Sequence, residues 1–149
     1  MNLQSEVIEF RNSIQRKYPN AKTEIPFIIR LLENPGSPLA LPGATTLYDH
    51  DCIHVLLKQN TSLRGEAFVI GFCMGNSSKI ARVHVLIYKS IAKSIYPRKY
   101  RFSKPHLVEY DRGFNYGASQ QIRDIHSLNF KQYHFYSSNF IRKLLKLTL

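Results

Sequence analysis

The chain is 149 residues long, 44% of them hydrophobic, and carries 21 Lys and Arg against 10 Asp and Glu, a formal net charge of +11. A chain of this length buries about 68–70% of its unfolded surface, so residues 1–149 are expected to form one domain around one core. The longest apolar run, residues 67–74, is far shorter than the roughly 18 residues that a membrane-spanning helix needs. The positive charge predicts attraction to an anionic membrane surface, a nucleic acid or a phosphorylated ligand.

Two helices are predicted in the first third of the chain. Residues 1–17 place apolar side chains at helical spacing, and the pattern ends near Pro19. Thr23 is a suitable N-cap for a second helix that runs through Leu32 and ends at residues 34–36. Prolines at 35, 38 and 42 predict that residues 37–43 form a surface loop, of the kind that folds over a pocket.

The middle of the chain is predicted to form two helices joined by a short polar turn at residues 59–62. Thr46 and Asp49 match a capping box ahead of the first helix. Ser62 opens the second, which is apolar nearly all round until Gly75 and is therefore expected at the centre of the bundle. The core positions expected in the first of these helices are Leu47, Ile53, Leu56 and Leu57.

Three more helices are expected after residue 77. Ser78 is predicted to cap the first, on whose apolar face His84 is expected to be a satisfied core histidine. The second starts at Pro105 and carries Gly113 and Gly117, a stripe that another helix or a lipid chain can approach closely. The last is capped by Ser137 or Ser138 and is expected to turn Ile141, Leu144 and Leu145 inward and Arg142, Lys143 and Lys146 outward. The sequence thus predicts an all-α single-domain bundle of about seven helices.

Residues 89–104 combine basic and aromatic side chains around Pro97. The plain interpretation is a solvated loop. Aromatic residues such as Tyr96 and Phe102 beside lysines and arginines are also typical of a patch that lies at the headgroups of an anionic membrane. The same composition could stack nucleic-acid bases and neutralise phosphates.

Candidate metal ligands follow the Thr46 cap. His50 and His54 are four residues apart, so on a helix they lie on one face, about 40° apart around the axis. Asp51 flanks that face and is expected to be a ligand or to orient an imidazole. Residue 60 is the midpoint between His54 and Glu66, so an antiparallel helix hairpin would bring Glu66 opposite His54.

Two nitrogens with one or two carboxylates suit Zn²⁺ first, and Fe²⁺, Mn²⁺ or Mg²⁺ as alternatives. The plain alternative is that His50, Asp51 and His54 form a solvent-exposed stripe on their helix. Glu66 would then stand in the first turn of the next helix because a negative charge there interacts favourably with the helix dipole. The two cysteines are expected to be reduced thiols of a cytoplasmic protein. Neither is expected to be a ligand, because Cys52 points away from the histidines and Cys73 lies about 10 Å from Glu66.

The motif His-Asp-x-x-His, eleven residues and then Glu resembles the signature of the Coq-four family of ubiquinone (coenzyme Q) biosynthesis. The resemblance extends from residue 25 to the C-terminus. The matching residues are His50, Asp51, His54 and Glu66, with Arg30-Leu31-Leu32-Glu33, Gly65-Glu66-Ala67, Arg112-Gly113 and Gly117-Ala118 in the surroundings.

The resemblance implies a metal-binding protein of prenylated-quinone biosynthesis that binds a polyprenyl lipid or quinone precursor. It further implies a metal-dependent oxidative decarboxylation, in which the ring carboxyl of a polyprenyl-hydroxybenzoate is replaced by a hydroxyl, with Glu66 or Asp51 moving a proton. The implied partners are an anionic membrane surface, contacted peripherally, and other quinone-biosynthesis proteins. Nucleic acid is the least favoured partner.

Three alternative functions stay open at this point. The first is a non-catalytic, lipid-binding scaffold of a quinone-biosynthesis complex. The second is a metallohydrolase that activates water, which would need further ligands from His84, His106, Asp124 or His126. The third is a small basic nucleic-acid-binding module, which would show steep salt dependence and no need for metal.

Overall fold

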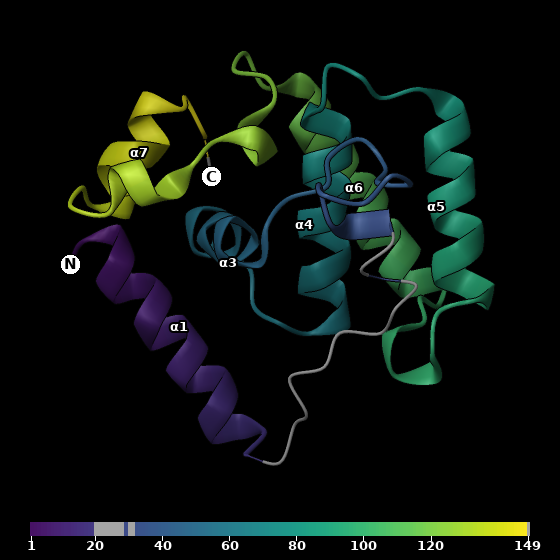
Figure 1. The fold of residues 1–149 in the computed structure, drawn as a ribbon, viewed down its shortest axis with the longest axis horizontal. Coiled ribbons are helices and arrows are strands. Elements are labelled where there is room, and N and C mark those ends of the chain that lie inside the picture. Colours follow the sequence, from purple (N-terminus) through teal and green to yellow (C-terminus); the bar gives the residue numbers. More distant parts are fainter. Residues whose placement is uncertain (20–28, 30–31, 149) are drawn as a thin grey trace.

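The described part of the chain, residues 1–19, 29 and 32–148 of a computed structural model, forms a helical bundle without strands (Figure 1). The prediction of an all-α fold is confirmed, and the six α-helices of this part come close to the expected seven. The helix predicted from Thr23 to Leu32 falls largely outside the described residues. The α-helices are α1 (Leu3–Lys17), α3 (Leu47–Leu56), α4 (Leu63–Asn76), α5 (Arg82–Ser94), α6 (Lys104–Ser119) and α7 (Ser138–Leu144), with 3-10 turns at Arg98–Tyr100, Ile125–Ser127 and Phe130–Tyr133.

Helices α4 and α6 pack side by side at the centre, with their backbones in contact (Figure 1). Each helix contributes two glycines, four residues apart, to this contact. A Cβ atom on any of the four would collide with a carbonyl oxygen of the facing helix, so no other residue fits there. The colliding pairs are Gly71 with Tyr110, Gly75 with Phe114, Gly113 with Phe68 and Gly117 with Phe72. The glycine stripe therefore receives a helix and not a lipid chain.

Side-chain caps fix the two helices that carry the predicted metal ligands. Thr46 Oγ1 accepts a hydrogen bond from the N–H of Asp49 at 3.2 Å, and Ser62 Oγ accepts one from Gly65 N–H at 3.2 Å. Both predicted caps are confirmed. In the turn between the helices Lys58 adopts a left-handed backbone with φ 53°, which reverses the chain direction.

Several surface and core predictions are wrong. Leu47 is 64% exposed, because it stands at the first position of α3 on the outer side of the capped turn. Leu144 is exposed as well, at the last position of α7. Arg142 turns inward instead of outward, and its guanidinium donates to the carbonyl oxygens of Val55 and Leu56 at 2.8 and 2.7 Å. It thereby satisfies the C-terminal end of α3.

The start of α5 also differs from the prediction. Ala81, and not Ser78, precedes the helix, and its N–H donates to Nδ1 of His84 at 3.0 Å. His84 is therefore a helix-capping residue and not a core histidine. Ser78 N–H instead donates to Asp124 Oδ1 at 2.8 Å, a partner 46 residues away.

An aromatic cluster fills the space between α5, α6 and the segment that joins them. Tyr88 stacks on Tyr110 with ring centroids 5.4 Å apart, and it meets Tyr96 and Phe102 edge-on. Tyr96 is 2% exposed and Phe102 4%. These two side chains are core residues, so they cannot contribute to the membrane-facing patch predicted within residues 89–104. None of the helices in the described ranges has the length and apolar character needed to cross a membrane.

Candidate metal site and adjoining cavity

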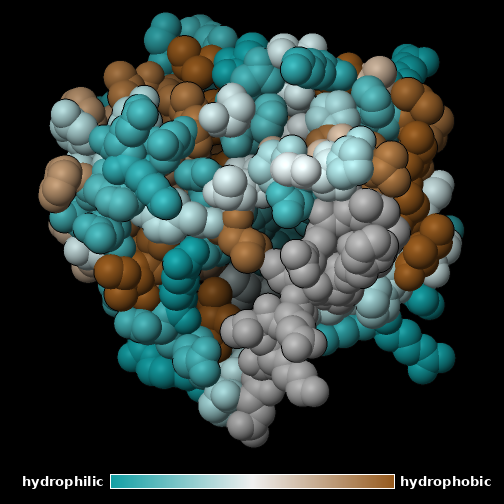
Figure 2. Space-filling view, viewed as in Figure 1, coloured by the Kyte–Doolittle hydropathy of each residue, from teal (hydrophilic) through white to brown (hydrophobic). Residues whose placement is uncertain are grey.

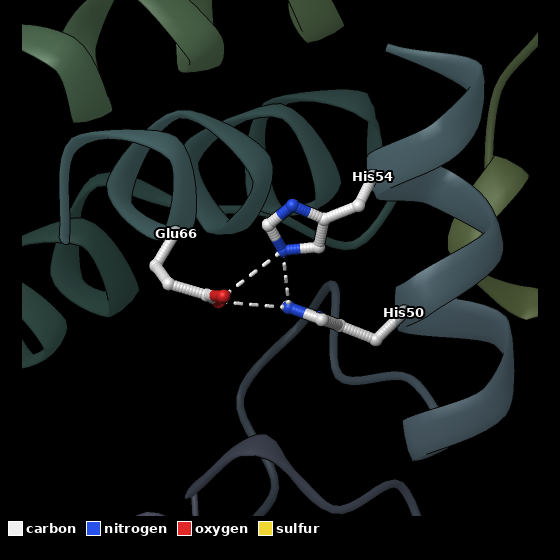
Figure 3. A group of neighbouring side chains, drawn as sticks. All are labelled: His50, His54 and Glu66. Atoms are coloured by element: carbon white, nitrogen blue, oxygen red, sulfur yellow. Dashed lines mark hydrogen bonds and ion pairs between the residues drawn. The ribbon is translucent and has the colours of Figure 1, made fainter. Parts of the chain in front are cut away.

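Three side chains from α3 and α4 converge on one point, as the sequence predicts (Figure 3). His50 and His54 project from successive turns of α3, and their Nε2 atoms lie 3.0 Å apart. Glu66, in the first turn of α4, faces both of them. Its Oε2 lies 3.0 Å from His50 Nε2 and its Oε1 lies 3.2 Å from His54 Nε2. One ligand atom from each of the three residues fits within 4.8 Å of the others.

The orientation of His54 is fixed by groups outside the cluster. Its Nδ1 lies 3.3 Å from the carbonyl oxygen of Gln59, an acceptor, so Nδ1 carries the proton and donates it there. A neutral imidazole with its proton on Nδ1 can offer the lone pair of Nε2 to a metal ion at the point where Glu66 and His50 converge. The ring of Phe10 packs against His54 at 5.4 Å, and His54 is only 1% exposed. A backbone acceptor behind a histidine is the arrangement that orients metal-binding imidazoles.

The electrostatics of the cluster favour a bound cation. Burial by itself raises the pKa of Glu66, but hydrogen bonds and charge interactions with His50 and His54 lower it well below its ordinary value. Burial by itself lowers the pKa of His50, but the hydrogen bond and charge of Glu66, followed by the charges of Glu33 and Asp51, raise it. Two imidazole nitrogens that face each other beside a carboxylate need a proton or a metal ion between them. The group formed by His50, His54 and Glu66 can therefore hold a metal ion.

Asp51 does not join the three-residue group. Its carboxylate binds Nε of Arg11 from α1 at 2.6 Å. Asp51 lies beside the cluster, and its negative charge helps to raise the pKa of His50. The expectation that Asp51 is a metal ligand or proton carrier thus lacks the geometry that His50, His54 and Glu66 have.

The other residues considered as ligands also lie outside the group. His84 and His106 accept hydrogen bonds from the backbone N–H groups of Ala81 and Ser103 at the starts of α5 and α6. Asp124 accepts from Ser78, and His126 belongs to a 3-10 turn. Both cysteines are buried, unpaired and outside the group. Within the described ranges, the extra ligands that a hydrolase would require are not assembled here.

A cavity of about 850 Å³ adjoins the cluster, and His50 and Glu66 form part of its wall. Most of its lining is apolar, including Ile70, Met74 and Phe102. The loop predicted at residues 37–43 contributes Leu41, Pro42 and Gly43 to the wall. A largely apolar cavity with a few convergent polar groups is typical of a site for a small hydrophobic ligand.

Glu33 is a further acidic residue of this cavity, beside Glu66 and Asp51, and the sequence did not predict it as a site residue. Its Oε1 accepts hydrogen bonds from the hydroxyl groups of Tyr96 at 2.7 Å and Tyr88 at 3.2 Å. Burial raises the pKa of Glu33, and this effect outweighs the lowering by those hydrogen bonds and by the charge of His50. The two tyrosines are 63 and 55 residues away in the chain, so no local sequence pattern could have joined them to Glu33.

Comparisons of the chain with protein-family models, with curated proteins and with solved structures found no match. The resemblance to the Coq-four family therefore rests on the motif from His50 to Glu66 and on the flanking residues named with it. The convergence of two imidazoles and one carboxylate is a separate observation, which does not depend on that resemblance.

Proposed function

We propose that this chain binds a divalent metal ion through His50, His54 and Glu66 and places it beside a hydrophobic ligand in the adjoining cavity. The observation that carries the proposal is the convergence of the three ligand atoms within 4.8 Å. Two nitrogens and one carboxylate suit Zn²⁺ or Fe²⁺ better than Mn²⁺ or Mg²⁺, which prefer oxygen ligands. Three protein ligands leave coordination positions open, as in catalytic rather than structural sites.

The ligand class that we propose is a prenylated quinone precursor. A cavity of about 850 Å³ with mostly apolar walls has room for an aromatic ring and part of an apolar chain. The resemblance of the motif supports the same class. In the catalytic form of the proposal, the ring carboxyl of a polyprenyl-hydroxybenzoate leaves as CO₂ and a hydroxyl takes its place. This replacement is a two-electron oxidation, for which dioxygen from solution would be the oxidant and the source of the hydroxyl oxygen.

In such a reaction the bound ion would supply Lewis acidity to oxygen atoms of the ligand. The residues of the chain would hold and orient the reactants and exclude water. Both Glu66 and Asp51 line the cavity. Proton transfer falls to Glu66 rather than to Asp51, because Glu66 reaches both imidazoles, whereas Arg11 holds the carboxylate of Asp51.

A lipid-binding scaffold is the second candidate function, and the cavity itself favours it. The apolar walls would hold a prenyl chain whether or not a metal ion was present. A scaffold would keep its lipid after the metal had been removed with a chelator, whereas a metal-dependent enzyme would lose turnover.

We place the source of this ligand in an anionic membrane, because a polyprenyl lipid is too insoluble to diffuse freely. The surface that supports contact is α5, where Val83, Leu86 and Ile87 are exposed along one side. Figure 2 shows hydrophobic residues gathered along the edge of the molecule where α5 lies. Lys79, Arg82 and Lys93 flank these side chains, and the chain as a whole carries a net charge of +11. Anionic headgroups complement this combination.

The metal site is tested by elemental analysis of protein purified without added metal. Wild-type protein is expected to carry about one metal ion per chain, and His54→Ala to lose it while keeping its helical content by circular dichroism. His106→Ala is the matched control, because His106 caps α6 outside the group. Retention of stoichiometric metal by His54→Ala would remove the basis of the proposal.

A further inference from the structure

The carboxyl group of Glu33 is held by two tyrosine hydroxyl groups at the wall of the cavity. Both tyrosine hydroxyls donate to the same oxygen, Oε1, so the second oxygen is not used by either bond. The rings that carry these hydroxyls cannot adjust, because Tyr88 and Tyr96 are almost fully buried and pack edge-on against each other at 6.2 Å. Keeping a carboxyl group in such surroundings costs free energy that a neutral or apolar side chain would avoid.

Glu33 shares its cavity with the metal cluster. Glu33, His50 and Glu66 all line the same space, and His50 and Glu66 are close enough for their charges to act on Glu33. The surfaces around them are largely apolar, and the aromatic rings of Tyr88 and Phe102 contribute to them. A few polar groups in an apolar cavity fix the orientation of a ligand.

We infer that Glu33, oriented by Tyr88 and Tyr96, is a specificity-determining residue that accepts a hydrogen bond from the ring hydroxyl of an alkylated phenol bound in the cavity. The inference deepens the proposed function and rests on it for the ligand class. It does not require the metal ion, since Glu33 and its two tyrosines come from residues outside the metal cluster. An alkylated phenol complements this cavity. Its hydroxyl can donate a hydrogen bond to the carboxyl group of Glu33, and its ring and alkyl chain can pack against the apolar walls.

The experiment compares para-pentylphenol with its methyl ether, para-pentylanisole, by calorimetry on chelator-treated protein. In the ether a methyl group replaces the hydroxyl hydrogen, so the ether cannot donate a hydrogen bond to Glu33. Wild-type protein is expected to bind the phenol about 10-fold more tightly, as is typical of one net hydrogen bond. Equal affinities in the wild-type protein would overturn the inference without the need for any variant.

Glu33→Gln is the diagnostic variant. Its side chain keeps one oxygen to accept from the tyrosines and puts an NH₂ group, which cannot accept, in place of the other oxygen. The preference for the phenol is expected to fall to within about threefold of unity. Asp51→Asn is the matched control, because Asp51 is a carboxylate of the same cavity that is paired with Arg11, and its loss is expected to leave the preference unchanged.

The outcomes separate this inference from the metal site. Metal content is measured on the same preparations, before the chelator is added. Loss of the phenol preference in Glu33→Gln with metal retained supports the inference. A folded Glu33→Gln that keeps the wild-type preference overturns it, whatever the metal content. Wild-type protein that lacks metal but prefers the phenol would contradict the metal proposal alone.

Discussion

Under the proposed function, the protonation of His50 links metal binding to pH. Its raised pKa results from Glu66, whose hydrogen bond and charge outweigh the lowering by burial. In metal-free protein the pair contributes stability that is fully present below the unfolded pKa of about 6.5 and is lost as pH rises through the folded pKa. Metal must displace the same proton, so metal affinity is expected to increase with pH over that interval.

Thermal unfolding with Zn²⁺ and with chelator, over a series of pH values, measures this competition. The increase in melting temperature caused by Zn²⁺ is expected to be small on the acid side of the folded pKa of His50 and to grow above it. A Zn²⁺-induced increase that was the same at every pH would contradict the assignment of His50 as a ligand. His106→Ala, outside the cluster, is expected to follow the wild-type profile.

Asp51→Asn tests the assignment of that carboxylate to Arg11 instead of the metal. The pair is partly exposed, with Arg11 46% and Asp51 21% accessible, so its loss is expected to cost at most about 1 kcal/mol of unfolding free energy. Metal stoichiometry is expected to persist, while Glu66→Gln loses it. Elemental analysis of both variants measures the metal content. Loss of metal in Asp51→Asn would show that Asp51 is a metal ligand after all.

At the scale of elements, the contact between α4 and α6 depends on the absence of side chains at four positions. Gly113→Ala and Gly117→Ala are each expected to lower the unfolding free energy by about 3 kcal/mol, because the added Cβ meets a carbonyl oxygen of α4. Gly36→Ala is the control, since a Cβ there meets only ordinary contact distances. Urea denaturation measures all three. Wild-type stability in Gly117→Ala would contradict the packing described here.

Prediction of helix starts from the sequence succeeded where a Ser or Thr side chain caps the helix locally, and it missed the local cap at Ala81, which a histidine side chain provides. The Thr46 and Ser62 caps lie within three residues of their partners, and the position of Glu66 follows from the symmetry of a short turn. Prediction from the sequence failed where the interacting residues are distant in the chain. Ser78 binds Asp124, and Asp51 binds Arg11, at separations of 46 and 40 residues. Such pairs are decided by tertiary packing, which a single sequence does not display.

The difference between local and distant partners also explains which residues of the candidate site could be predicted from the sequence. Two histidines four residues apart and a carboxylate beyond the turn could be identified from spacing alone. The carboxyl group of Glu33 could not, because its partners come from α5 and from the segment that follows it. Tyr96 and Phe102 were assigned to the surface because basic neighbours surround them, yet their rings are large enough to form the core between two helices.

At the scale of the whole molecule, the exposed side of α5 and the net charge of +11 together predict binding to anionic vesicles. Liposomes with phosphatidylserine are expected to bind the protein in sedimentation assays, and binding is expected to weaken as salt screens the headgroups. Leu86→Ser should weaken binding at high salt, because it removes exposed apolar surface and leaves the charge unchanged. Val108→Ser, on α6, is a control with similar exposure. Binding that was equal on neutral and anionic vesicles would contradict the charge contribution.

The position of the metal cluster along the chain has a consequence for the order of assembly. His50 and Glu66 are only 16 residues apart, so the α3–α4 hairpin closes a short loop at small entropic cost. The cavity requires Tyr88, Tyr96 and Phe102, which arrive only when α5 and the following segment have packed. Local contacts form faster than distant ones. Under the proposed function, capture of the ion would therefore precede formation of the ligand cavity, and a newly made chain would acquire its metal before it could hold a lipid.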